Sequence, residues 1–120
     1  MSLKIRAIRE KGVLAKERVV LYSDSSEEIG QYLVGVSKSE GNGMVSSELR
    51  HTIWLPDHKV GAGDLVVVYS KKSAQELKVK ENEDGTKTTF VYWGLDHPIF
   101  DYEDSVAVLL KIGDWSWKSS

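Results

Sequence analysis

Apolar and polar residues alternate in this chain over short segments that end at turn-forming residues. Apolar side chains occupy every second position of residues Leu3–Ala7, and Glu17–Tyr22 is a second short, mainly apolar segment. A period of two puts alternate side chains on the two faces of a β-strand, whereas an amphipathic helix repeats every 3.6 residues. We therefore expect strands rather than helices.

Glycine-containing turns separate the strands. Gly41–Gly43 and Asn82–Gly85 supply the positive φ angles that tight hairpins need. After the first turn, Met44–Leu55 is expected to form a return strand that ends at Pro56, because proline has no N–H to donate. Gly61–Gly63 leads into an apolar strand and not into a helix, which favours an ordinary turn over a phosphate-binding loop.

Two further strands and one ambiguous segment complete the expected fold. Thr86–Trp93 is rich in β-branched and aromatic residues, and Ser105–Ile112 is apolar enough to be expected in the centre of a sheet or buried on both faces. Ser73–Glu76 has the spacing of a capping box and predicts at most one helical turn. The sequence thus predicts an all-β sandwich of about eight to nine mostly antiparallel strands.

The composition limits the number of domains and the kinds of functional site that the chain can hold. A chain of 120 residues that is 41% hydrophobic can close one core, so we expect a single domain over residues 1–120. The absence of cysteine excludes disulfides, thiolate zinc sites and a cysteine nucleophile. With 16 basic and 18 acidic residues, a dedicated electrostatic nucleic-acid binder is not expected, although a local basic patch stays open. We expect neither a signal peptide nor a transmembrane segment, because no apolar run approaches about 18 residues.

Three stretches, taken in order, form a more specific pattern of strands, polar loops and a glycine turn. They are Glu17–Tyr22 with Ile29–Val34, Leu55–Pro56 with Val60–Tyr69, and Val91–Gly94 with Phe100–Val106. This pattern resembles the lamin tail domain, an immunoglobulin-like β-sandwich found in nuclear lamins and as a separate module in bacterial proteins. The resemblance extends over most of the chain. It implies an immunoglobulin-like sandwich that acts as a docking or accessory module, without shared catalytic residues.

Candidate catalytic and metal-binding residues are few. Histidine and carboxylates recur in one loop, where the weak candidates for a metal site are Asp96, His97, Asp101 and Asp104. No spacing typical of a metal site links them, so we expect no metal or cofactor, and we interpret this loop as turn carboxylates bonded to backbone N–H groups with Phe100 beneath the end of the sandwich. No Gly-x-Ser-x-Gly motif or glycosidase-like carboxylate pair is recognisable, which favours a non-enzymatic protein.

The four tryptophans are the better functional candidates. Trp54 and Trp93 lie in apolar strands and are expected in the core. Trp115 and Trp117 would point to the same side of an extended chain. The favoured interpretation is a last strand that buries both indoles. The alternative is an exposed platform for a sugar or a protein partner, which Tyr92 and Tyr102 would extend.

The lysines around the expected hairpin alternate with glutamates, which is typical of a solvated sheet edge. They are Lys71, Lys72, Lys78, Lys80 and Lys87. The sequence therefore predicts a non-catalytic interaction or accessory module that presents loops and a sheet edge to a protein partner. The alternative function is a carbohydrate-binding module that uses Trp115, Trp117 and neighbouring aromatic residues. Neither specific nucleic-acid binding nor membrane insertion is predicted.

Overall fold

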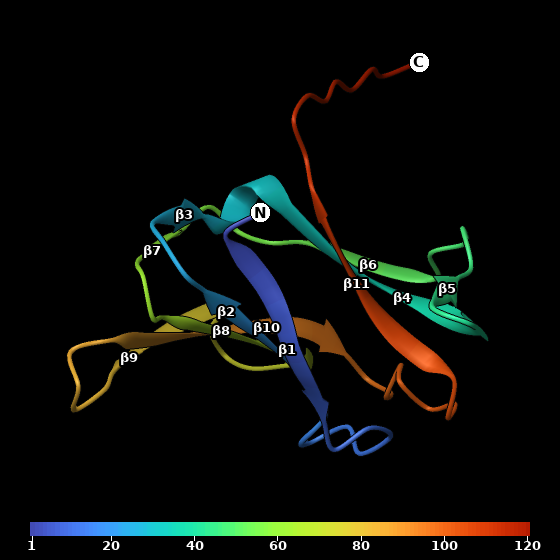
Figure 1. The fold of residues 1–120 in the computed structure, drawn as a ribbon, viewed down its shortest axis with the longest axis horizontal. Helices are drawn as coiled ribbons and strands as arrows, with labels where there is room; N and C mark the ends of the chain where they lie inside the picture. The colour runs from blue at the N-terminus through green and yellow to red at the C-terminus, as the bar shows by residue number, and fades with distance from the viewer.

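Two β-sheets face each other across the core of the computed structural model, which describes residues 1–120 (Figure 1). Eleven strands and one three-residue 3₁₀ helix make up the regular structure, and three of the strands are only two residues long. The predicted all-β sandwich is confirmed. All strand pairs are antiparallel except that of β8 with β10.

The larger sheet has five strands in the order β1-β2-β8-β10-β9. Their bounds are β1 Leu3–Arg9, β2 Arg18–Ser23, β8 Leu65–Lys71, β9 Leu77–Glu81 and β10 Lys87–Leu95. After β8 the chain first forms β9 at the edge of the sheet and then turns back as β10, which lies between β9 and β8 and therefore runs parallel to β8. The turn at Asn82–Gly85 forms as predicted, with Gly85 at a φ of 88°.

The smaller sheet is built around the longest strand, β4, which pairs with β11 on one side and with β5 and β6 on the other. Its strands are β4 Tyr32–Gly41, β5 Met44–Val45, β6 His51–Trp54 and β11 Ser105–Lys111. A two-stranded ladder of β3 Glu27–Glu28 and β7 Lys59–Val60 lies apart from both sheets. The hairpin at Gly41–Gly43 forms as predicted, with positive φ angles at all three residues.

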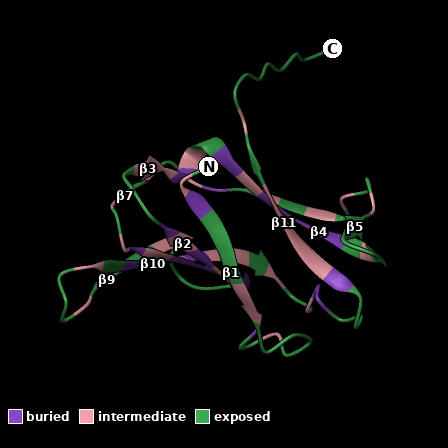
Figure 2. Ribbon diagram, viewed as in Figure 1, coloured by how far each residue is buried: buried purple, intermediate pink, exposed green.

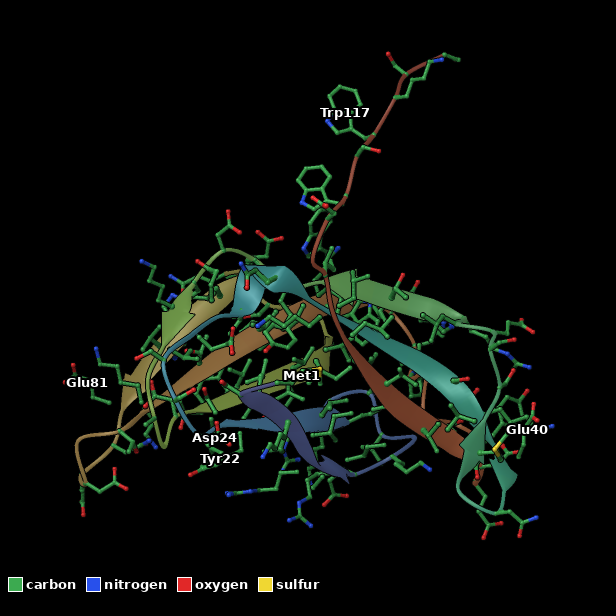
Figure 3. All side chains as sticks on the ribbon, turned by 45° about the horizontal axis from the view of Figure 1, so that its top comes forward. Met1, Tyr22, Asp24, Glu40, Glu81 and Trp117 are labelled. Carbon is green, nitrogen blue, oxygen red and sulfur yellow. The ribbon has the colours of Figure 1, made fainter.

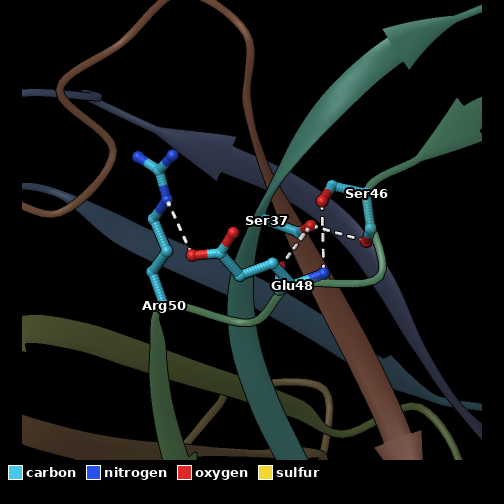
Figure 4. Close-up of polar contacts among 4 residues, drawn as sticks. All are labelled: Ser37, Ser46, Glu48 and Arg50. Carbon is cyan, nitrogen blue, oxygen red and sulfur yellow. Dashed lines mark hydrogen bonds and ion pairs between the residues drawn. The ribbon is translucent and has the colours of Figure 1, made fainter.

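The return strand after this hairpin is interrupted, contrary to the expectation of one strand over Met44–Leu55. The Ser37 hydroxyl lies 2.9 Å from the Ser46 carbonyl oxygen and 2.8 Å from that of Glu48 (Figure 4). Glu48 N–H in turn donates to Ser46 Oγ, and the Arg50 guanidinium lies 3.9 Å from the Glu48 carboxylate. These side-chain contacts replace the backbone ladder between β5 and β6, so the chain bulges away from β4 there.

The prediction for Ser105–Ile112 is wrong in its position. This segment forms β11, which is an edge strand, because it pairs only with β4. Ala107 and Leu109 pack against the core, while Leu110 is exposed. The inner face of β11 therefore covers one side of the core, and the outer face of the strand stays uncovered.

The helical turn also forms at a different place. It is the 3₁₀ helix η1, Ile29–Gln31, in which Gly30 N–H donates to the Glu28 carboxylate at the N-cap. The Ser73–Glu76 segment instead leads into β9 without helix, since Tyr92 N–H donates to the Glu76 carbonyl and extends the β9–β10 ladder.

The core between the sheets consists of buried residues from both sheets, from η1 and from the loops that join the strands (Figure 2). Its largest members are Tyr32, Phe100, Leu3, Leu21 and Ile29, and Trp93 packs against it while partly buried, so the prediction for Trp93 is confirmed. Phe100 lies beneath the end of the sandwich, also as predicted. No helix of the chain is long and apolar enough to cross a membrane.

One buried charge ties the β1–β2 loop, strand β8 and the loop before β11 together at the end of the sandwich where Phe100 lies. The fully buried Glu17 carboxylate accepts hydrogen bonds from the backbone N–H groups of Gly12, Ile99 and Phe100 at 2.9, 3.0 and 3.0 Å, and from the Ser70 hydroxyl at 2.5 Å. Burial by itself would raise the pKa of Glu17, but these four donors outweigh it and lower the pKa below its usual value. We call this group of contacts the Glu17 cluster. The N–H groups of Ile99 and Phe100 thus bond to Glu17. The prediction that the carboxylates of their own loop accept these bonds is wrong.

Candidate functional site

The outer face of the smaller sheet carries an apolar row that no part of the chain covers fully. Leu110 of β11, Leu33 of β4 and Trp54 of β6 are direct neighbours across the sheet. Leu110 is 40% exposed and Trp54 45% exposed, while Leu33 between them is partly buried. Because directly paired residues point to the same face of a sheet, these three side chains form one surface.

Trp54 is therefore not a core residue, and the prediction for it is wrong. Its neighbours Ile53 and Leu55 pack toward the core, so the alternation of the strand turns Trp54 outward. The indole is still fixed in place, since its Nε1–H donates to the carbonyl oxygen of Gly30 in η1 at 2.7 Å. Its ring is left available to a second aromatic group.

That second group is Trp115. The two indole rings lie 4.8 Å apart, centroid to centroid, with an interplanar angle of 88°, which is the edge-to-face arrangement that aromatic pairs favour. Ile112 N–H donates to the Gln31 carbonyl at 2.7 Å and fixes the start of the C-terminal segment beside η1. Trp115 is nevertheless 61% exposed and Trp117 78% exposed. Figure 3 shows Trp117 on the C-terminal segment, well away from both sheets.

The favoured interpretation of Trp115 and Trp117 as a closing strand is wrong, and the register explains why. The last residue of β11, Lys111, pairs with Tyr32, which is the first residue of β4. Beyond that point β4 offers no backbone to pair with, so the chain leaves the sheet and its indoles stay in solvent. We call Leu33, Trp54, Leu110, Trp115 and Trp117 together the tryptophan patch.

An open sheet edge adjoins the tryptophan patch. Strand β6 pairs with β4 on one side and with no strand on the other. Leu55 N–H donates to the Tyr32 carbonyl at 3.1 Å, so the alternation of an antiparallel ladder turns the backbone N–H and C=O groups of Thr52 and Trp54 away from β4. Such unpaired groups can accept an added strand from another chain.

The other two aromatic candidates do not join this surface. Tyr92 stacks on Tyr69 of the larger sheet, with centroids 5.7 Å apart and an interplanar angle of 12°. Tyr102 is 61% exposed in the loop before β11, where it lines a small cavity with Arg50 and Asp104. Of the four predicted site residues, Trp115 and Trp117 thus belong to the tryptophan patch, whereas Tyr92 and Tyr102 lie elsewhere and apart from each other.

The candidate metal ligands are also dispersed. Asp96 contacts His97, with Oδ1 2.7 Å from Nδ1, and this hydrogen bond lowers the pKa of Asp96. Asp104 lies 3.7 Å from the Lys38 ammonium group, and Asp101 only lines the small cavity near Tyr102. No three His, Asp or Glu side chains of the chain are grouped so as to hold a metal ion.

Sequence reasoning missed Trp54, Leu33 and Leu110 as members of the candidate site. The sequence held a signal for Trp54: it stands between the apolar residues Ile53 and Leu55, and strict alternation puts a residue between two core-facing neighbours on the outside. No comparable signal identified Leu33 or Leu110, because their exposure depends on which strands are neighbours. Comparisons with protein-family models, curated proteins and solved structures found nothing that matches this chain.

Proposed function

We propose that this protein is a non-catalytic interaction module that binds a protein partner through the tryptophan patch and the adjoining edge of β6. The observation that carries this proposal is the exposed Trp54–Trp115 pair on an outer sheet face. Exposed aromatic groups that are held in a fixed geometry lose little conformational entropy on binding, and tryptophan is enriched among the residues that dominate interface energies.

The open edge of β6 suggests how the partner binds. An extended peptide could hydrogen-bond to the outward N–H and C=O groups of Thr52 and Trp54 and so add a strand to the smaller sheet. One of its apolar side chains would then lie over the row formed by Leu33 and Trp54, beside Trp115. Main-chain bonds would supply affinity, and the aromatic pair would select the side chain.

The proposal is tested by selecting random displayed peptides on the immobilised protein and measuring the affinity of the recovered peptides for variants. We expect Trp115→Ala to weaken binding at least tenfold. Tyr102→Ala is the matched control, because Tyr102 has the same exposed fraction as Trp115, 61%, but lies in another loop. Peptides that bind both variants equally well, or that lose affinity only with Tyr102→Ala, would contradict the proposal.

Carbohydrate binding is the second candidate function. The exposed indoles of Trp115 and Trp117 favour it, because sugars stack on bare aromatic rings. The perpendicular arrangement of Trp54 and Trp115 argues against it, since a flat platform needs coplanar rings. A polysaccharide panel titrated against intrinsic tryptophan fluorescence separates the two functions: a saturable shift that Trp117→Ala abolishes would support sugar binding, and the absence of any shift would remove it.

We also propose that the sandwich is of the lamin tail, immunoglobulin-like type. The support is the resemblance of Glu17–Tyr22, Val60–Tyr69 and Phe100–Val106 to that family, with which a two-sheet architecture is compatible. The resemblance favours a docking or accessory module attached to another activity, in keeping with an exposed binding patch and the absence of a recognisable catalytic group.

A further inference from the structure

The outer face of the five-stranded sheet carries a second surface, which is unrelated to the tryptophan patch. Strand pairing places its residues in three rows across the sheet, and two more residues join them. The rows are Arg9, Arg18, Tyr69 and Tyr92; Ala7, Val20, Val67, Phe90 and Lys78; and Lys4, Tyr22, Leu65, Thr88 and Lys80. Arg6 and Lys71 belong to the same face, because their charged groups lie over the rings of Tyr22 and Tyr69.

The charge on this face is of one sign. It holds seven of the 16 basic residues of the chain, whereas none of the 18 acidic residues occupies a strand position on it. Asp24 and Glu76 lie just outside the strands, and Asp24 forms the face's single ion pair, with Lys4 at 3.2 Å. The other six cations have no carboxylate partner. A molecule with a formal charge of -2 thus presents a strongly positive face.

Aromatic rings occupy the middle of the face, between two groups of cations. The Arg6 guanidinium lies 4.3 Å from the ring centroid of Tyr22, and the Lys71 ammonium 4.7 Å from that of Tyr69. Tyr69 also contacts Phe90 and Tyr92 on the neighbouring strand. The cations on β1 and β9 are four strand spacings apart, about 19 Å at the usual spacing of 4.8 Å. The rings lie in the strip between them.

We propose that this face binds single-stranded nucleic acid without sequence preference. Its two groups of cations suit the phosphates of a flexible strand, and arginine in particular matches phosphate oxygens in a bidentate manner. The Tyr22 ring and the Arg6 guanidinium over it form a stack that an unpaired base can extend by stacking on the guanidinium. A duplex would leave the rings without a role, because its bases are already stacked and paired.

Other polyanions fit this face less well. No large apolar side chain on it is exposed, so a membrane surface would gain charge contacts but no insertion. An acidic polysaccharide needs a bare ring for its sugar, whereas the Tyr22 ring is covered by Arg6 and the Tyr69 ring is packed against Tyr92 and Lys71. A base, unlike a sugar, can stack on the covering guanidinium itself.

Fluorescence anisotropy of a labelled 12-nucleotide DNA strand, titrated with the full chain, tests the ligand class. We expect saturable binding that weakens roughly a hundredfold between 50 and 200 mM salt, as for about five phosphate contacts to a single strand. A strand with the same phosphates but abasic sugars should bind about tenfold more weakly, because it cannot stack. No binding, equal binding of the abasic strand, or equal or tighter binding of a duplex, a polyuronate or anionic vesicles would overturn the proposal.

Matched charge variants test the surface. Arg9→Gln/Lys78→Gln/Lys80→Gln removes three exposed cations from the face, and Arg50→Gln/Lys59→Gln/Lys118→Gln removes one arginine and two lysines from exposed positions elsewhere. We expect the first to weaken strand binding at least tenfold with a shallower salt dependence, and the second to change it less than twofold. Equal weakening by both variants, or none by the first in a protein with unchanged circular dichroism, would overturn the assignment. Neither variant replaces a residue of the tryptophan patch, so this test is independent of the protein-binding proposal.

Discussion

The Glu17 cluster and the tryptophan patch reverse the usual burial of their residue types. Glu17 is a carboxylate that is fully buried, whereas Trp54, Trp115 and Trp117 are large indoles left largely in solvent. Charged groups are seldom fully buried unless they are paired, and clustered exposed indoles are uncommon on a small monomeric domain.

The difference lies in what each group contacts inside the molecule. Four donors, from two loops and from strand β8, satisfy the Glu17 carboxylate, so its burial serves the stability of the fold. Trp117, by contrast, has no aromatic or hydrogen-bonding partner, while Trp54 and Trp115 form an aromatic pair in which Trp54 also donates one hydrogen bond, to Gly30. A buried charge with all its bonds made indicates a structural role, whereas indoles that pack against no core are the basis of the proposed role in binding.

Removing the buried carboxylate should have the largest effect. Glu17→Ala leaves three backbone N–H groups and the Ser70 hydroxyl without their acceptor, so we expect a loss of about 3 to 5 kcal/mol in the free energy of unfolding. Chemical denaturation measures it. Glu83→Ala, at an exposed site in a hairpin turn, is the control and should change stability by less than about 0.5 kcal/mol. A similar small loss in both variants would show that the Glu17 cluster contributes nothing.

The same cluster should make stability depend on acid pH. Because the pKa of Glu17 is lower in the folded protein than in the unfolded chain, where it is about 4.3, the stabilisation is fully present above that value. It is lost as the pH falls through the folded-state pKa. Glu17→Gln lacks this titration, so its unfolding free energy should fall less steeply below about pH 5 than that of the original protein. Parallel pH profiles of the two proteins would contradict the prediction.

A smaller effect is expected where the tryptophan patch is tied to the fold. Trp54→Phe keeps an aromatic ring but removes the Nε1–H that donates to the Gly30 carbonyl, and the loss of this one hydrogen bond should cost about 1 kcal/mol. Thermal unfolding monitored by circular dichroism measures the change. A loss as large as that of Glu17→Ala would mean that Trp54 supports the core after all.

Trp117→Ala should have the smallest effect on stability. Its side chain is 78% exposed, so we expect a change within about 0.5 kcal/mol in the free energy of unfolding. In iodide quenching of the intrinsic fluorescence, the same variant should lose a readily quenched component. Unchanged quenching together with a marked loss of stability would place Trp117 against the sandwich.

The parts of the fold that local chemistry determines could be predicted from the sequence. Gly41–Gly43 and Asn82–Gly85 form hairpins because their residues adopt positive φ angles with little strain, and that requirement does not depend on the rest of the chain. The strands on either side follow from alternation. Trp93 was correctly assigned to the core because it lies in an apolar strand, and Phe100 was correctly placed beneath the end of the sandwich.

What could not be predicted depends on contacts between distant residues. The backbone donors to Glu17 at Ile99 and Phe100 lie 82 and 83 residues further along the chain, and no local pattern links them. Leu110 is exposed only because β11 is an edge strand. Trp115 and Trp117 leave the sheet because β4 begins opposite Lys111, which is a matter of register between strands that are far apart in sequence.

Backbone amide mapping tests most directly whether the tryptophan patch and the edge of β6 form the binding surface. Amide hydrogen exchange and chemical shifts would be recorded with and without a peptide selected on the protein. We expect the N–H groups of Thr52 and Trp54 to become protected and the indole signals of Trp54 and Trp115 to shift. Protection and shifts confined to the loop of residues 97–104, with β6 and both indoles unchanged, would contradict it.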